Sequence, residues 1–165
     1  MALVTANTAT VEKRKNIKLA FSGWALPTGS NATSPYGTGI LDCADVEFTT
    51  IGRPDPDENE VIELPTSHRT IKASVAKKSW QNWSKIGILN DEAGTNWKEF
   101  VAAKELETTG TLILSNRLTG TVIGAWTVQV VGMDSGDGGA DELDDAFTPT
   151  FAILADVTPS NDKDQ

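Results

Sequence analysis

The sequence has very little of the chemistry on which metal sites and disulfide-stabilised folds depend. Among 165 residues there is one cysteine, Cys43, and one histidine, His68. A single cysteine cannot form an intrachain disulfide. A chain without intrachain disulfides fits a reducing compartment. One cysteine and one histidine cannot supply any of the usual four-ligand zinc sites. We therefore expect no metal and no cofactor.

The motifs of common enzymes are also missing. There is no Gly-x-Ser-x-Gly nucleophile elbow, no Gly-x-x-x-x-Gly-Lys phosphate loop and no Gly-x-Gly-x-x-Gly dinucleotide fingerprint. His68 lies between Pro65 and Arg69, in a segment typical of a loop. No sequence motif places a nucleophile and an orienting acid beside His68, as a catalytic triad requires. We therefore predict that the protein is not an enzyme.

No run of apolar residues approaches the roughly 20 that a membrane-spanning helix needs. The first ten residues are small and polar, and the basic residues Lys13, Arg14 and Lys15 come after them. This order is not that of a secretory signal. We therefore expect no membrane insertion and synthesis in the cytoplasm of the producing cell.

Basic residues are scarce: 14 Lys and Arg stand against 23 Asp and Glu, a formal net charge of −9. A protein that grips nucleic-acid phosphates needs the opposite sign. From Asp134 onward, nine acidic residues face one base, Lys163. This block is typical of a solvated loop and tail, or of a surface that repels a negative partner.

The segment from Asp134 to Glu142 also has the acid and glycine content of a calcium loop. The EF-hand pattern fails, however, because its third and fifth positions fall on Gly136 and Gly138. A solvated loop is the favoured interpretation, and calcium binding there is left open.

Alternating apolar and polar residues predict most of the remaining elements as strands. Residues 1–14 lack periodicity and are predicted to be a flexible arm, and residues 158–165 a polar tail. Proline and glycine predict loops at 26–39 and 52–57. The predicted strands are 17–21, 40–50, 61–64, 70–76, the second half of 80–89, 110–118, 121–131 and 147–157.

One segment, Thr95–Leu106, has helical periodicity, with Trp97 and Phe100 on one face and Thr95 or Asn96 as candidate N-caps. The sequence thus predicts one domain over residues 15–157, with no internal repeat. Its fold class is mainly β: two packed antiparallel sheets, sandwich-like or barrel-like, flanked by a single α-helix.

The chain has five tryptophans but only one tyrosine. We predict that Trp97 and Trp126 belong to the core. Trp80 and Trp83 lie three apart among polar residues and are interpreted as half-exposed aromatics at a protein interface. The same pair would suit a sugar-binding platform. A nucleic-acid stacking platform is disfavoured because few basic residues lie nearby.

The order of elements resembles that of the tail tube proteins of tailed bacteriophages and contractile injection machines. The closest local likeness is a strand led by Trp83 that ends in Asn90-Asp91-Glu92-Ala93 and leads into the helix with Trp97 and Phe100. The resemblance extends over roughly residues 15–157. It implies a phage tail-tube-like fold in which six copies join their sheets into a ring and rings stack into a hollow tube.

The resemblance also implies a function: a structural virion protein of the phage tail that self-assembles as a conduit for genome delivery. Its partners would be copies of itself and other tail proteins, while DNA passes through without specific binding. An acidic lumen suits such a conduit, and the lumen candidates are Asp42, Asp45 and Glu47. The expected contacts between rings come from the long loop, with candidates Leu26, Pro27, Gly29, Asn31, Pro35 and Tyr36.

Two other functions stay open. One is a capsid decoration protein or another tail protein, such as a terminator. The other is a carbohydrate-binding β-sandwich module that uses Trp80 and Trp83.

Overall fold

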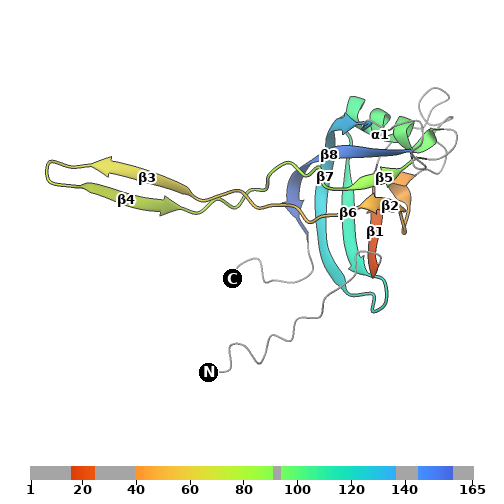
Figure 1. Cartoon of the computed structure of the whole chain (residues 1–165), viewed down its shortest axis with the longest axis horizontal. Coiled ribbons are helices and arrows are strands. Elements are labelled where there is room, and N and C mark those ends of the chain that lie inside the picture. The colour runs from red at the N-terminus through yellow and green to blue at the C-terminus, as the bar shows by residue number, and fades with distance from the viewer. Residues whose placement is uncertain (1–15, 25–39, 91–93, 137–144, 158–165) are drawn as a thin grey trace.

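The computed structural model describes residues 16–24, 40–90, 94–136 and 145–157 (Figure 1). The predicted N-terminal arm, the loop at 26–39 and the C-terminal tail lie outside these residues. The described strands are β1 (Ile17–Ser22), β2 (Phe48–Thr50), β3 (Glu60–Pro65), β4 (Thr70–Val75), β5 (Gly87–Leu89), β6 (Thr109–Asn116), β7 (Val122–Asp134) and β8 (Ala146–Asp156). A 3-10 helix, Ile40–Asp42, precedes β2, and the α-helix α1 spans Thr95–Glu105.

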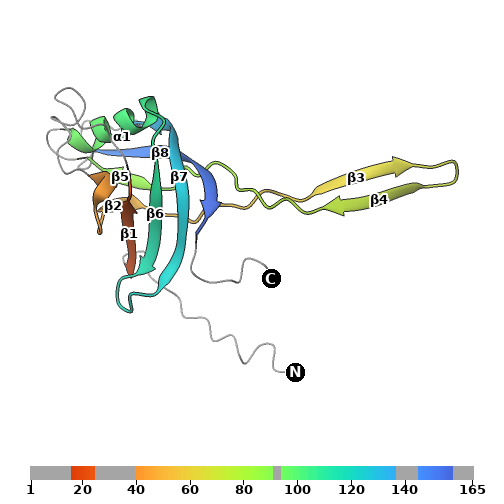
Figure 2. The ribbon, with the colours of Figure 1, turned by 180° about the vertical axis from the view of Figure 1, so that it is seen from behind.

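The strands form two antiparallel sheets. Six strands, in the order β1-β6-β7-β8-β5-β2, make a strongly curved sheet, and β3 pairs only with β4 in a hairpin that extends away from it (Figures 1 and 2). The prediction of a mainly β fold with one helix and two antiparallel sheets is confirmed. The larger sheet curves until it is nearly a barrel, so the packed layers are its two opposite sides.

The barrel is brought close to closure by the segment before β2. The amide of Val46 donates to the carbonyl of Leu19 at 2.8 Å, and the amide of Phe21 donates to the carbonyl of Cys43 at 2.9 Å. Residues 43–46 therefore lie along the outer edge of β1. Strand β2, which follows them, pairs with β5 at the opposite edge of the sheet. The middle of β1 is consequently not a free edge at which a neighbouring chain can add a strand.

The core follows from the period-two pattern of the long strands. Buried side chains alternate along β1 (Leu19, Phe21), β6 (Leu112, Leu114) and the middle of β7 (Trp126, Val128, Val130). The expectation that Trp126 belongs to the core is confirmed, since it is 5% exposed. Trp97 is half-buried and packs edge-to-face on Phe147, with 5.6 Å between ring centroids.

Helix α1 packs against the barrel mainly through Phe100. Its ring is fully buried and makes edge contacts with Phe21 at 5.6 Å and Phe147 at 5.3 Å between centroids. Aromatic pairs in this geometry contribute about 0.5–1.5 kcal/mol beyond their area burial. The helix thus closes one part of the core that the curved sheet leaves open.

The start of α1 differs from the prediction. The N-cap is Gly94, with φ of 70° and no side-chain cap, so neither Thr95 nor Asn96 caps the helix. The Asn96 amide donates instead to the carbonyl of Leu89 at 3.0 Å, and Asn90 accepts from the amide of Trp97 at 3.2 Å. Contacts with the end of β5 therefore replace a local cap, and glycine is suited to the left-handed conformation.

The predicted strand over residues 40–50 is also wrong for most of its length. Residues 40–42 form a 3-10 helix and only Phe48–Thr50 are a strand. The amides of Ile40 and Leu41 donate to the carboxylate of Glu99, at 2.9 and 2.7 Å. A buried acceptor on α1 therefore satisfies backbone groups that a strand would have paired with a sheet.

Candidate assembly surface

The hairpin of β3 and β4, called the arm below (Glu60–Val75), is the most exposed part of the described protein. Every residue of both strands is exposed, and Figures 1 and 2 show the arm standing clear of the barrel. Its tip is held by Thr66, whose hydroxyl accepts from the amide of Arg69 at 3.0 Å and donates to the carbonyl of Arg69 at 2.7 Å. His68 lies in this turn, as the sequence predicted.

The two faces of the arm differ sharply in polarity. Residues opposite one another in an antiparallel pair lie on the same face. One face carries the rungs Leu64–Ile71, Ile62–Ala73 and Glu60–Val75, and the other carries Pro65–Thr70, Glu63–Lys72 and Val61–Ser74. The first, called the apolar face below, has five apolar residues out of six. The second is mostly polar and includes an ion pair of 3.4 Å between Lys72 and Glu63.

Nothing within the described protein covers the apolar face. Leu64 is 54% exposed, and Ile62 and Ile71 are each 41% exposed. A two-stranded hairpin alone in water is marginally stable, and it usually needs packing on one face. A contiguous exposed apolar surface rimmed by polar residues marks an interaction site. The apolar face is therefore a candidate binding surface.

The arm also differs in charge from the rest of the chain. Between Glu60 and Lys78 there are two acids, Glu60 and Glu63, and four bases, listed here: Arg69, Lys72, Lys77 and Lys78. This segment carries +2, which leaves ten bases and 21 acids, or −11, for the remainder. The +2 comes from Lys77 and Lys78, which follow the arm, whereas the arm itself has two acids and two bases and is neutral.

The root of the arm is fixed by the two tryptophans that the sequence analysis assigned to an interface. Trp83 is 1% exposed, its Nε1 donates to the carbonyl of Gly52 at 2.8 Å, and its ring lies 5.0 Å from that of Trp126. Trp80 is half-buried and packs edge-on against the same Trp126 ring at 6.2 Å. The expectation of a half-exposed Trp83 is thus wrong, because the rings of Trp126 and Phe151 and a backbone acceptor enclose it.

This burial also removes the observation that favoured a carbohydrate-binding module. A sugar platform presents aromatic ring faces to solvent, and Trp83 has almost no exposed surface.

Further contacts secure the root of the arm: the amide of Asp57 donates to the carbonyl of Ser79 at 2.9 Å, and Lys85 pairs with Asp55 at 2.5 Å. The arm is therefore a projection with a firmly anchored base.

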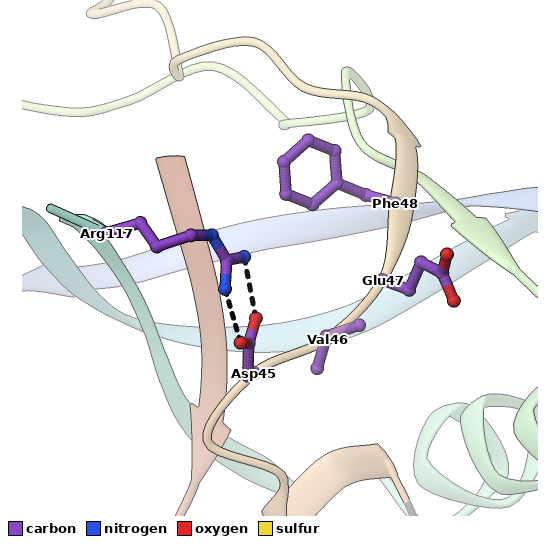
Figure 3. A pocket seen from close by; sticks show the side chains of 5 residues that line it. All are labelled: Asp45, Val46, Glu47, Phe48 and Arg117. Atoms are coloured by element: carbon purple, nitrogen blue, oxygen red, sulfur yellow. Dashed lines mark hydrogen bonds and ion pairs between the residues drawn. The ribbon is translucent and has the colours of Figure 1, made fainter. Parts of the chain in front are cut away.

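A second surface feature lies beside β2. Five residues line an open hollow of about 440 Å³, and Figure 3 shows them: Asp45, Val46, Glu47, Phe48 and Arg117. Val46 is buried at 2% exposure and Phe48 is half-buried. The hollow thus combines two apolar side chains with three charged ones.

Asp45 and Arg117 form the main polar contact of the hollow. The guanidinium donates two hydrogen bonds to the carboxylate, one of them 2.8 Å between Nη2 and Oδ1. These bonds and the positive charge of Arg117 lower the pKa of Asp45 from its ordinary value. Both side chains are well exposed, so water and salt screen the pair.

The residues predicted to line a lumen do not share a sheet face. Figure 3 shows Glu47 pointing away from the Asp45–Arg117 pair, while the Phe48 ring lies on the side of that pair. The alternation inferred for this segment is wrong because residues 43–47 bend around β1 and are not a regular strand. Asp42 is exposed at the end of the 3-10 helix. The three acids therefore do not form one acidic wall.

Several other predicted sites lie outside the described residues. The loop candidates Leu26, Pro27, Gly29, Asn31, Pro35 and Tyr36 all do so, as does most of the possible calcium loop. Within that loop, Asp134 accepts from the amide of Gly136 at 2.8 Å. Among the residues that the structure describes, no three His, Cys, Asp or Glu side chains gather as metal ligands.

Comparisons with known proteins leave the family open. No protein-family model matches the chain, and no curated protein matches its sequence. None of the described helices is long and apolar enough to cross a membrane.

Proposed function

We propose that this protein is a structural subunit that assembles with copies of itself, and that it builds the tail tube of a tailed bacteriophage or a related injection machine. The observation that carries the proposal is the uncovered apolar face of the arm. Folding exposes this face on an element that is otherwise poorly stabilised, and burial at about 25 cal/mol per Å² favours covering it. A partner chain supplies such cover.

The proposed tube consists of stacked hexameric rings, located in the virion tail, through which DNA passes without specific binding. The resemblance rests on a strand pair joined by a long loop, a further strand that runs into one helix, and strands that follow the helix. The short strand β5 before α1 and the long strands β6, β7 and β8 after it support the later part of this order. The function is structural and not catalytic. Other tail proteins would join the tube at its ends.

The wall of the proposed lumen needs a different assignment from the three acids. We assign it to the outer face of β6, β7 and β8, where half-buried uncharged side chains alternate with the core residues. They include Thr111, Thr127, Gln129 and Thr150. Such a wall offers phosphate no Lys or Arg that would hold it through counterion release.

The test is assembly of the purified full chain at rising concentration, followed by sedimentation velocity and negative-stain microscopy. We expect rings or hollow tubes. A variant in which Glu60–Val75 is replaced by a short Gly-Asn turn should stay monomeric. None of the five tryptophans lies in the arm, so an unchanged tryptophan emission spectrum verifies that the barrel is folded.

Two results would contradict the proposal. One is a wild-type chain that stays monomeric at every concentration, and the other is an armless variant that still forms tubes. A capsid decoration subunit also fits an exposed arm, but such a subunit would bind a shell and remain discrete by itself. Rings or tubes from the isolated chain therefore separate the two functions.

A further inference from the structure

We propose that the arms of neighbouring copies join edge to edge, so that β4 of one copy pairs as a strand with β3 of the next. The copies then share one antiparallel sheet that continues from arm to arm. This inference rests on the proposed self-assembly and adds the two strand edges that meet. Three observations carry it: free edges, opposite charge and a matching register.

Both outer edges of the arm are free within the described protein. The sheet of the arm has two strands, so β3 and β4 have one neighbour each, and all of their residues are exposed. Unpaired strand edges are templates for another strand, and a sheet that is stable by itself generally has three or more strands. A strand from another copy therefore supplies what the arm lacks.

The turn at the tip shows which backbone groups lie on these edges. The amide of Thr66 donates to the carbonyl of Arg69 at 2.7 Å, so these two residues are a hydrogen-bonded pair. Bonded and non-bonded pairs alternate along an antiparallel ladder, and the three rungs of the apolar face are consequently bonded pairs. The residues between those rungs direct their backbone groups outward: Val61, Glu63 and Pro65 on β3, and Thr70, Lys72 and Ser74 on β4.

The two sides of the hairpin have opposite charge, although the arm as a whole is neutral. Residues 55–65, which lead to the tip, include five acids and no base, whereas residues 66–79, which lead back, include four Lys or Arg and no acid. Opposite charges attract β4 to β3 of another copy, and like charges oppose the pairing of β3 with β3 or of β4 with β4. Charge therefore favours a second copy of this chain as the partner, joined through unlike edges.

The direction of the strands suits this contact. Within one arm β3 and β4 are antiparallel. When two arms lie side by side in the same orientation, β4 of one therefore runs opposite to β3 of the next. A contact between two different edges of identical chains repeats from copy to copy and yields a ring or a filament. Pairing of like edges would end with two copies, so the unlike pairing is the one that fits the proposed rings.

Lys72 and Glu63 set the register between copies. They lie opposite each other within one arm, joined by an ion pair of 3.4 Å, and the backbone groups of both point outward. When Lys72 of one copy lies opposite Glu63 of the next, every Lys72 has an acid on both sides. Directly opposite side chains in antiparallel strands lie about 4.5–5.5 Å apart at their Cβ atoms, within reach of such a pair.

The same register covers part of the apolar face. It places Ile71 of one copy beside Leu64 of the next, and Ala73 beside Ile62. The apolar faces of successive arms then lie on one side of the shared sheet. Each exposed apolar side chain at these positions gains a neighbour in the next copy and loses contact with water.

Disulfide cross-linking between two mixed populations tests the register. In a Cys43→Ser background, one population carries Leu64→Cys and the other Ile71→Cys with a tag that changes its mass. Non-bonded opposite residues have Cα atoms about 4.5 Å apart, which a disulfide spans. After mild oxidation we expect tagged–untagged dimers on a non-reducing gel. The matched control replaces Ile71→Cys by Thr70→Cys, on the polar face, and should give at least several-fold less mixed dimer.

Each other outcome overturns the edge pairing. Homodimers from either population alone in place of mixed dimers mean that like edges meet. Equal cross-linking from Thr70→Cys contradicts the register. Assemblies visible by microscopy without mixed dimers reject the contact and leave the proposed function standing, whereas absence of any assembly rejects both proposals. An unchanged tryptophan emission spectrum verifies that each variant has a folded barrel.

Charge exchange between two populations gives a second measurement that needs no cysteine. Lys72→Glu and Glu63→Lys each break the ion pair within the arm and place like charges on both edges, so each alone should weaken assembly at least several-fold by sedimentation. An equimolar mixture should recover much of the loss, because alternating copies again bring opposite charges together. The pair within each arm stays broken in the mixture, so recovery reports the contact between copies.

Lys98→Glu and Glu105→Lys are the matched controls, since they make the same changes of charge at exposed positions of α1. Each should leave assembly nearly unchanged. No recovery in the mixture, or equal loss from the α1 variants, contradicts the pairing of Lys72 with Glu63 of the next copy.

Discussion

Glu99 and Leu41 are joined by a hydrogen bond of 2.7 Å across 58 residues of sequence. The same carboxylate accepts from the amide of Ile40 at 2.9 Å, and Glu99 is 1% exposed. A buried carboxylate is stabilised by donors of this kind, and the donors are satisfied in return. The bond therefore holds the 3-10 helix on α1 and sets the path of the chain toward β2.

We predict that Glu99→Ala lowers the free energy of unfolding by about 2–4 kcal/mol, because two amides lose a charged acceptor in a buried place. Glu99→Gln keeps one acceptor oxygen and should cost less than Glu99→Ala. Equilibrium denaturation followed by tryptophan fluorescence measures both. Glu105→Ala, at an exposed position of the same helix, is the control and should change stability little.

The same bond explains why the sequence misled at residues 40–50. Val46 and Phe48 alternate with acids there, and this pattern favoured one continuous strand. The local structure is decided by Glu99, a hydrogen-bond acceptor on a helix that lies far away in sequence. The backbone bonds of this segment to Leu19 and Phe21 of β1 also fix it. Alternation does not report such long-range partners.

Trp83 gives the second prediction. Trp83→Phe should lower the free energy of unfolding by about 1–3 kcal/mol, because the carbonyl of Gly52 loses its indole donor and the smaller ring fills the core less well. Trp80→Phe is the matched control, since Trp80 is half-buried and its ring makes one edge contact. Equal costs for the two variants would mean that Trp83 is no more important to the core than Trp80.

The arm marks a limit of another kind. Alternation at 61–64 and 70–76 correctly predicted the strands β3 and β4, and the four residues between β3 and β4 form a turn. The pattern states that one face seeks burial, but it does not state what covers that face. The core strands β6 and β7 have the same kind of alternation, so the sequence did not distinguish a strand of the barrel from a strand that awaits another chain.

Acid gives the third prediction, at the Asp45–Arg117 pair. Because bonding to Arg117 lowers the pKa of Asp45 in the folded state, the pair stabilises the fold above the ordinary carboxyl value of about 3.9. That contribution is lost as the pH falls through the lowered folded value. Asp45→Asn should therefore lower the thermal midpoint slightly near neutral pH, with the difference from wild type vanishing in strong acid.

Salt provides the control for this pair. The side chains are exposed, so raising the ionic strength at neutral pH should also shrink the difference between Asp45→Asn and wild type. A difference that grows on acidification would show that the folded-state pKa of Asp45 is raised and not lowered.

Limited proteolysis gives the last prediction, because the rate of cleavage in the arm reports directly whether another chain covers it. Among the sites within the described residues, trypsin should cut the monomer first after Arg69, Lys72, Lys77 or Lys78, since this hairpin is exposed and opens at little cost. The barrel should survive the cut, because Leu19 and Phe21 before the arm pack in one core with Phe100 and Phe151 after it. In the assembled protein, cleavage at these positions should be at least several-fold slower, because the arm becomes buried.

Cleavage after Lys98, on α1, serves as the control and should be slow in both forms. Mass spectrometry identifies each product. Equally fast arm cleavage in monomer and assembly would show that the assembly leaves the apolar face uncovered.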